Sequence, residues 1–421
     1  MKILRRTFLA ATLSLTFISG AAVAAPVTID FWTAWDPGQA DAKAAQAAIK
    51  DFEAANPDIT IKPQVIAFDA LHNKLVTAIA GGDSPDLSWG LIEWFGELNR
   101  MGALADLTDQ MAAWPDRDAI YPNALKQLTV DGRLMALPNY LGLRALLYHS
   151  DMLKEAGLSS PPETWDALVD AAKTIREKTG KHGFGIAGRG VRSPQELLMY
   201  LAQNEVEIAR LQSDGKYRNT WKDDPAELGR AAEVFAFYRR MLDEAVVPPQ
   251  AAGWGWEEED TNFALGQYAM AVNGSWMRTR TEQNPKEMAD VLVAPPPAGG
   301  KPATFFEIAP IFVYKQEDPA KAEAVWKFAS FMLGRDVQQK MFPDRSPRSD
   351  VEGDEVWGKP FTALTGIGVS FPPVALGSIT RAMEDSVARV LLKNDAPETV
   401  AAKLGEAVNK SLRQSGQLSA E

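Results

Sequence analysis

A regular alternation of strand and helix patterns over residues 28–91 constrains the fold more than any other feature of this 421-residue chain. Strand patterns begin at Thr28, Ile59 and Pro85, and helical apolar spacing lies between them at 39–56 and 69–82. Each helical pattern stops at a proline or glycine signal. Strands that alternate with helices in so short a segment predict a parallel sheet with helices on its faces, which is an α/β fold.

The carboxyl ends of these three strands carry an unusual set of polar and aromatic residues. In open α/β sheets the loops at these ends form the ligand crevice. Each end has a carboxylate and two have a tryptophan: Trp35 and Asp36, then Asp69, then Glu93 and Trp94. We therefore expect these side chains to lie near a ligand, with Trp35 forming an apolar wall beside Asp36.

The N-terminus has the pattern of a cleavable secretory signal peptide. Lys2, Arg5 and Arg6 form a positive region, a mostly apolar run follows, and small residues occupy 22–24. The apolar run is too short to span a membrane, so we expect residues 1–24 to be removed and the protein to be periplasmic. The paired arginines leave both the Sec and the twin-arginine export routes open.

Composition excludes several classes of function. The chain has no cysteine, so it has no disulfide framework, no thiol catalysis and no lipid-bearing cysteine. Its formal net charge of −11 argues against nucleic acid as a partner. The three histidines are scattered without metal-ligand spacing, and we expect no cofactor.

A second strand-and-helix series follows the first. The segments 144–149 and 183–188 have strand patterns, and a long helical pattern begins after Thr164. Residues 25–421 exceed what one hydrophobic core usually organises, so two lobes are expected. The Pro/Gly-rich stretch 294–303 is the clearest candidate for a connection between them.

Six segments of the chain occur in an order and spacing that match a known family. They are AIAGGDSPDLSW, GALADLT, LLYHSDMLKEAGLSSPPETWDAL, FALGQYAMAVNGSWM, AVWKFASFMLG and MFPDRSPRSD. Each is weakly specific alone. Together they make essentially the whole mature chain resemble the extracellular solute-binding proteins, the family that includes the maltose-binding protein. One departure is YHSD, where the family usually has Tyr-Asn-Lys-Asp.

The resemblance implies a type II periplasmic-binding-protein fold, in which two α/β lobes are joined by a hinge and the ligand cleft lies between them. We expect residues 25–140 and 304–343 to form the N-lobe, and residues 141–303 and 344–421 to form the C-lobe. The resemblance also implies a monomer without enzymatic activity. It would capture a carbohydrate, an oligosaccharide or glycoside, by lobe closure and deliver it to the permease subunits of an ABC transporter.

A sugar site needs aromatic platforms for C–H faces and carboxylates for hydroxyl groups. The resemblance places Trp276 against the sugar, and Gly274 is expected to let the backbone turn so that this ring projects. It also aligns Asp36 and Glu93 with sugar-binding carboxylates, although acids suit helix starts in any protein. Trp94 replaces an arginine of the maltose-binding protein, which argues against the same ligand and suggests another stacking surface.

Three further candidates each have a structural alternative. Asp69 could bind ligand or cap a helix, because Asp is a favoured N-cap. Tyr140 lies at the first expected crossing between the lobes and could contact sugar or pack in the hinge. Arg345 could bind a ligand oxygen or brace Asp344 and other acids of the cleft.

The GWGWEEED stretch supplies another pair of aromatic candidates. Trp254 and Trp256 share one face in extended geometry, and at least one is a possible platform. The acids that follow favour a helix start, so Glu258 or Glu259 is expected to act as a cap. Glu307, beside two phenylalanines, is a further cleft candidate.

Two alternative functions remain open from the sequence. The same fold could bind an anionic sugar derivative, a glycerol phosphodiester or a polyamine, the first two held by Arg144, Arg189, Arg192, Arg278 and Arg345. A glycoside hydrolase would also use carboxylates beside tryptophans. The ordered family segments and the lack of a catalytic signature count against such an enzyme.

Overall fold

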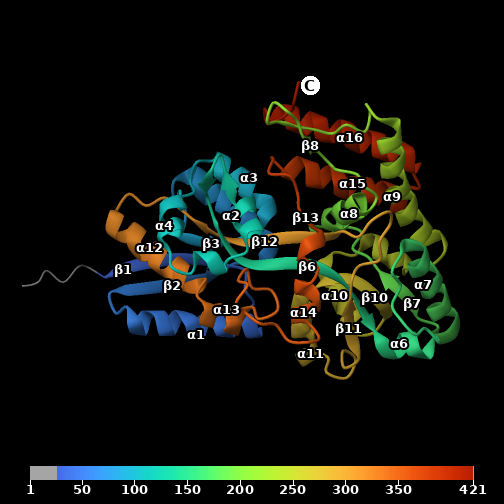
Figure 1. The fold of residues 1–421 in the computed structure, drawn as a ribbon, viewed down its shortest axis with the longest axis horizontal. Helices are drawn as coiled ribbons and strands as arrows, with labels where there is room; N and C mark the ends of the chain where they lie inside the picture. Colours follow the sequence, from blue (N-terminus) through green and yellow to red (C-terminus); the bar gives the residue numbers. More distant parts are fainter. Residues whose placement is uncertain (1–25, 421) are drawn as a thin grey trace, which may run out of the picture.

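A nine-stranded sheet of mixed direction runs through the computed structural model, which describes residues 26–420 (Figure 1). Its strands are β1 (Val27–Thr33), β2 (Ile59–Val65), β3 (Leu87–Trp89), β6 (Leu137–His149), β7 (His182–Gly185), β10 (Tyr268–Gly274), β11 (Val291–Ala294), β12 (Thr304–Val313) and β13 (Gly368–Val369). They lie in the order β2-β1-β3-β12-β6-β10-β7, with β11 paired to β6 and β13 paired to β12. Two short hairpins, β4 (Thr129–Val130) with β5 (Arg133–Leu134) and β8 (Arg210–Leu211) with β9 (Tyr217–Arg218), lie apart from it.

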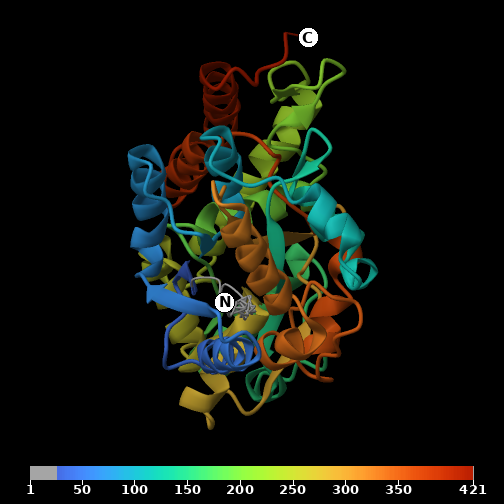
Figure 2. The ribbon, with the colours of Figure 1, turned by 90° about the vertical axis from the view of Figure 1, so that its left-hand side faces the viewer.

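The first three strands confirm the predicted parallel βαβαβ arrangement. β1 pairs in parallel with β2 and with β3, and the helices α1 (Ala40–Ala55) and α2 (Phe68–Gly81) connect them. α1 lies on one side of this sheet, and α2 and α3 (Ile92–Arg100) lie on the other (Figures 1 and 2). Gly82, directly after α2, caps the helix, and its positive φ of 75° favours glycine. In β1 the alternate residues Ile29, Phe31 and Thr33 are buried, whereas the residues between them are exposed or partly buried.

Two long antiparallel strands, β6 and β12, join the two lobes. The first half of β6 pairs with β12, from Leu137 opposite Ile311 to Leu143 opposite Phe306. From Arg144 onward β6 pairs with β10 and β11 instead. A third segment runs beside them, because the Leu141 N–H donates to the Arg345 carbonyl oxygen at 2.7 Å. These strands carry the chain between the lobes, as the type II periplasmic-binding-protein fold requires.

Helices of the second lobe cover β7, β10 and the far half of β6. The principal ones are α7 (Trp165–Thr179), α8 (Arg192–Gln203), α9 (Pro225–Asp243), α15 (Gly377–Lys393) and α16 (Pro397–Gln414). α15 and α16 pack on each other and on α8 and α9, far along the sequence from them (Figure 1). Their apolar faces form one hydrophobic cluster, and a second cluster surrounds β1, β3 and the helices of the first lobe.

The remaining helices are shorter or lie at the edges of the lobes. They are α4 (Thr108–Ala113), η1 (Arg117–Ala119), α5 (Pro122–Gln127), α6 (Ser150–Glu155), η2 (Pro249–Gly253), α10 (Trp256–Ala264), η3 (Ser275–Arg278), α11 (Thr279–Gln283), α12 (Pro319–Met332), α13 (Arg335–Met341), α14 (Gly358–Thr362) and η4 (Thr365–Ile367). None of the helices in residues 26–420 is long and apolar enough to cross a membrane. The predicted signal peptide, residues 1–24, lies outside the described residues.

Candidate ligand-binding site

A buried hydrogen-bond network joins the two lobes and both hinge strands. Gln195, near the start of α8, donates from its amide nitrogen to Glu93 of α3 at 2.6 Å and to Glu307 of β12 at 3.1 Å. The amide oxygen of Gln195 accepts from Arg144 of β6. The same guanidinium also pairs with Glu307 at 3.3 Å. One amide therefore links two carboxylates that come from different parts of the fold.

The Glu93 carboxyl group has a pKa well above that of an ordinary carboxyl group. Burial and the neighbouring Glu307 carboxylate raise the pKa of Glu93 to about 7. Its Oε1 accepts from Gln195, whereas its Oε2 is buried without a hydrogen-bond partner. Glu93 thus has one oxygen whose capacity to accept a hydrogen bond is unused.

Trp276 lies beside this network and is held by charged groups. Its ring is 4.4 Å from the Arg144 guanidinium carbon and 5.2 Å from that of Arg192. Its indole N–H donates to Asp260 at 3.2 Å. Arg192 is buried and pairs with both Glu259, at 2.7 Å, and Asp260. The ring position is therefore set by a network rather than by apolar packing alone.

Two glycines make room for the side chains of this region. A Cβ atom at Gly142 would lie 2.4 Å from the Glu307 side chain, and one at Gly274 would lie 1.7 Å from the Trp276 ring. The backbone of Gly274 has a φ of −102°, which other residues also adopt. The chain does turn directly after Gly274, into η3, but the backbone conformation of Gly274 does not require glycine. Its role is to leave space for the indole ring.

The end of β1 supplies an aromatic side chain with an unsatisfied donor. Trp35 packs edge-on against Phe31 and Phe342, with ring centroids 5.6 Å and 6.4 Å apart. Its indole nitrogen is buried and has no hydrogen-bond partner. Asp36, by contrast, is exposed and accepts only from the Gly38 backbone N–H, at 2.9 Å. The loop thus partly buries Trp35, including its indole nitrogen, and leaves the Asp36 carboxylate in solvent.

Tyr140 and Arg345 form a stacked pair. The Arg345 guanidinium carbon lies 4.3 Å from the centre of the Tyr140 ring and 5.0 Å from that of Phe342. Arg345 also donates to Asp41 of α1 at 2.9 Å. The predicted partner of Arg345, Asp344, pairs instead with Arg278. In this structure Arg345 therefore braces the hinge against α1.

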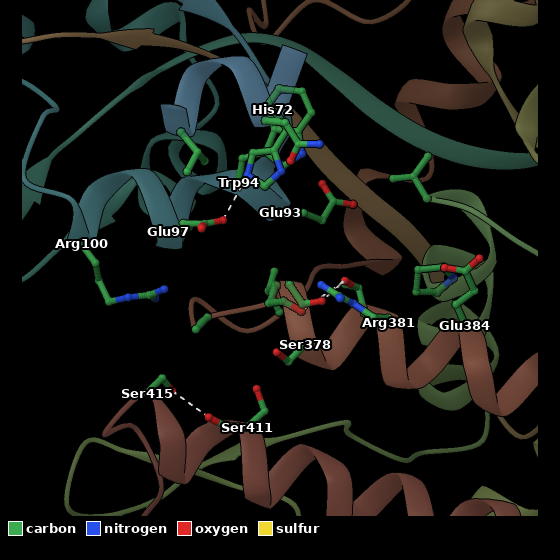
Figure 3. A pocket seen from close by; sticks show the side chains of 18 of the residues that line it. His72, Glu93, Trp94, Glu97, Arg100, Ser378, Arg381, Glu384, Ser411 and Ser415 are labelled. Carbon is green, nitrogen blue, oxygen red and sulfur yellow. Dashed lines mark hydrogen bonds and ion pairs between the residues drawn. The ribbon is translucent and has the colours of Figure 1, made fainter. Parts of the chain in front are cut away.

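A cavity of about 820 Å³ opens between the lobes next to Glu93 (Figure 3). Helices α2 and α3 form one wall, and the starts of α8 and α15 with the end of α16 form the other. The labelled lining residues are His72, Glu93, Trp94, Glu97 and Arg100 on the first wall and Ser378, Arg381, Glu384, Ser411 and Ser415 on the second. The His72 ring stacks on Trp94 at 5.0 Å with the planes 13° apart.

The comparisons with known proteins decide the family. A model of the bacterial extracellular solute-binding proteins matches residues 36–339. The chain belongs to this family. The sequence prediction of the family is therefore confirmed.

Relatives of this solute-binding protein, and solved structures of other proteins that are similar to it, agree with the assignment. The mannitol-binding protein of Pseudomonas aeruginosa is 26% identical over 294 residues, 67% of this chain and 65% of the relative. A solute-binding protein of an ABC transporter from Thermotoga lettingae, solved with α-D-tagatose, has a TM-score of 0.79 at 27% identity and covers 92% of this chain and 100% of its own. The GacH receptor of Streptomyces glaucescens has a TM-score of 0.80 at 24% identity, over 92% and 98% of the two chains, and supports the fold.

The solute-binding protein brings together some of the predicted residues and not others. Glu93, Glu307 and Trp276 share one network, although they are far apart in sequence. Trp94 lines the cavity but is only 8% exposed, with His72 against its ring. Asp69 is exposed in the first turn of α2, where the helix has no side-chain cap. The capping alternative for Asp69 was therefore wrong.

The tryptophans of the GWGWEEED stretch have different surroundings. Trp256 contacts Phe68 of α2 across the cleft, with ring centroids 5.8 Å apart. Trp254 stacks on Tyr268 within the second lobe, at 5.9 Å. The carboxylate of Glu258 accepts from the Gly255 N–H at 2.9 Å, which confirms its predicted cap role.

Sequence reasoning missed Gln195 and His72 as residues of the site. Gln195 lies in RSPQELL, which has no recognisable motif, and its partners are 102 and 112 residues away. His72 lies on an ordinary amphipathic helix and faces Trp94 only because α2 and α3 pack side by side. A pattern within either segment could not have identified these contacts.

Proposed function

We propose that this protein captures a carbohydrate in the cleft between its lobes and delivers it to the permease subunits of an ABC importer. The observation that carries the proposal is the meeting, at one lobe junction, of an indole ring, two carboxyl groups and one amide: Trp276, Glu93, Glu307 and Gln195. Rings of this kind cover the C–H faces of sugars, and the polar groups accept or donate to hydroxyl groups. The sugar-named relatives agree with this function.

Unsatisfied polar atoms of the first lobe and of the hinge strand β6 support a ligand rich in hydroxyl groups. Trp35 Nε1, Glu93 Oε2 and both amide atoms of Asn139 are buried without a hydrogen-bond partner. Leaving such a group unsatisfied costs about 1–3 kcal/mol. Hydroxyl groups both donate and accept, so a sugar could satisfy donors and acceptors together.

The arginines named for an anionic ligand are all occupied. Each donates to a carboxylate of the protein: Arg144 to Glu307, Arg189 to Glu258, Arg192 to Glu259 and Asp260, Arg278 to Asp344 and Asp354, and Arg345 to Asp41. A guanidinium in such a pair has less capacity for a phosphate or carboxylate ligand. This pairing favours a neutral sugar.

An acidic sugar derivative is the second candidate, because two other arginines line the cavity. Arg100 and Arg381 lie on opposite walls, and neither forms an ion pair with a carboxylate within residues 26–420. They are the groups that an acidic substituent would meet. The charges of Glu97 and Glu384 on the same walls oppose this alternative.

A thermal-shift screen of neutral oligosaccharides, acidic sugars and polyamines tests the proposal. A neutral sugar at about 100 times its Kd should stabilise the protein by about 2.7 kcal/mol. Trp276→Ala should weaken that binding by at least tenfold. Trp165→Phe, at a partly buried position that packs against the core of the second lobe, should not change it. A response to polyamines alone, or catalytic turnover of glycosides, would contradict the proposal.

We propose the remaining assignments on the same basis. Residues 25–140 and 304–343 form the N-lobe, and residues 141–303 and 344–421 form the C-lobe. The change of pairing partner along β6, between Leu143 and Arg144, supports a boundary within that strand. The protein is a periplasmic monomer exported through residues 1–24, which cell fractionation and light scattering of the purified protein would check.

A further inference from the structure

Gln195 joins a carboxyl group of the first lobe to the second lobe. Its two amide hydrogens go to two different carboxylates, Glu93 at 2.6 Å and Glu307 at 3.1 Å. Glu93 belongs to the first lobe, and Gln195 belongs to the second. The Glu93–Gln195 hydrogen bond therefore exists only while the lobes are in contact.

The charges in this junction do not balance. Arg144 is the cation of the group, and it pairs with Glu307. Glu93 is therefore a surplus carboxylate close to a second one, with its Oε2 buried and unpartnered. A proton on Oε2 would remove the surplus charge, and a ligand hydroxyl group that donates to Oε2 would satisfy the same atom.

We propose that Glu93 and Gln195 form a proton-controlled latch, which closes the lobes without ligand when Glu93 is protonated and needs a ligand hydroxyl group when it is not. The proposal rests on the proposed function, since it concerns the same cleft. Opening separates Glu93 from Gln195 of the second lobe and exposes the Glu93 carboxyl group to water, which lowers its affinity for protons toward the ordinary one.

The sign and range of the pH effect follow from this geometry. The pKa of Glu93 is about 7 with the lobes in contact, against an ordinary value of 4.5 in water. The closed form therefore binds more protons, and closure becomes more favourable as the pH falls from about 7 to about 4.5. Within that range the closed-to-open ratio should change by about tenfold per pH unit.

Other charged groups near Glu93 must be separated from its effect. Glu307 faces it from β12 and Arg144 from β6, while α15 contributes Arg381 and Glu384 to the same cavity. On its own helix, Glu97 and Arg100 follow. His72 of α2 pairs with Glu97 at 3.1 Å, and burial lowers the pKa of its imidazole. In the second lobe, burial raises the pKa of Glu196, next to Gln195, and that of Glu259, the latter to about 7.

Small-angle scattering of the ligand-free protein at several pH values between about 5 and 8.5 tests the latch. We expect the radius of gyration to fall as the pH is lowered, and we expect Glu93→Gln to be compact over the whole range. Gln195→Leu should remain extended at every pH. His72→Gln, the matched control, should retain the pH dependence. Circular dichroism at each pH verifies that every variant is folded.

A radius of gyration of the wild-type protein that does not change with pH would overturn the proposal, whatever the variants do. Retention of the pH dependence by Glu93→Gln, or its loss in His72→Gln, would also overturn it. No sugar is present in these measurements. A radius of gyration that does not depend on pH would therefore not contradict sugar capture. Likewise, a sugar screen without a response would not affect the conclusion drawn from the pH titration.

Discussion

Phe68 and Trp256 contact each other across the cleft, with their ring centroids 5.8 Å apart and their planes 60° apart. Phe68 begins α2 of the first lobe, and Trp256 begins α10 of the second. The contact is therefore a direct apolar link between the lobes, separate from the polar link between Glu93 and Gln195. Both links must break for the cleft to open.

Trp256→Ala should shift the ligand-free protein toward the open form. An aromatic pair of this geometry contributes about 0.5–1.5 kcal/mol, so the closed-to-open ratio should fall by about two- to tenfold. Trp256→Phe retains a ring and should show a smaller shift. Scattering or distance measurements between labelled lobes at constant pH would show this, and equal compaction of all three proteins would contradict it.

Trp35→Phe should show how far the ring contacts of Trp35 support protein stability and how far its indole N–H supports sugar binding. A phenylalanine retains ring contact with Phe31 and Phe342 but lacks the unpartnered indole N–H. We expect a change in unfolding free energy of less than about 1.5 kcal/mol. Sugar affinity should nevertheless fall about three- to tenfold, because one hydrogen bond contributes about 0.5–1.5 kcal/mol. Calorimetry and denaturant titration measure the two effects, and an unchanged affinity would exclude Trp35 as a donor to the ligand.

Gly274→Ala should weaken sugar binding without removing any group that contacts the sugar. Its new Cβ would overlap the Trp276 ring and force that ring from its place beside Arg144. Overpacking of this kind costs about 1–3 kcal/mol. Gly229→Ala, in α9 with no atom near the added Cβ, is the matched control and should be neutral or stabilising. Equal sugar affinity in both variants would mean that the position of Trp276 is not important.

Arg192→Ala should strongly destabilise the second lobe. Arg192 is buried and pairs with Glu259 and Asp260, which are also buried, so its loss leaves both carboxyl groups without their cation. Removing one member of a buried ion pair costs about 3–5 kcal/mol. Arg189→Ala breaks the exposed pair with Glu258 and should cost less than about 1 kcal/mol. Urea denaturation of both variants measures the two losses of unfolding free energy. Similar denaturation midpoints for the two variants would contradict the prediction.

Local signals in the sequence were sufficient for the secondary structure and the fold class. Gly82 caps the C-terminus of α2, and Glu258 caps the N-terminus of α10. Both caps could be predicted because their hydrogen bonds join residues only a few positions apart. The alternation of strands and helices likewise determined the parallel arrangement of β1, β2 and β3, since few other folds bury such a pattern.

Tertiary structure alone decided which polar side chains work together. Gln195 meets Glu93 and Glu307 only after α8, α3 and β12 have packed, and no spacing within RSPQELL indicates those partners. The same packing placed Asp36 and Asp69 in solvent while burying Glu307, although all three appeared equivalent as strand-end or cleft acids. The physical reason is that burial and charge pairing depend on neighbours distant in the chain, whereas turns, caps and amphipathic patterns depend on neighbours close in it.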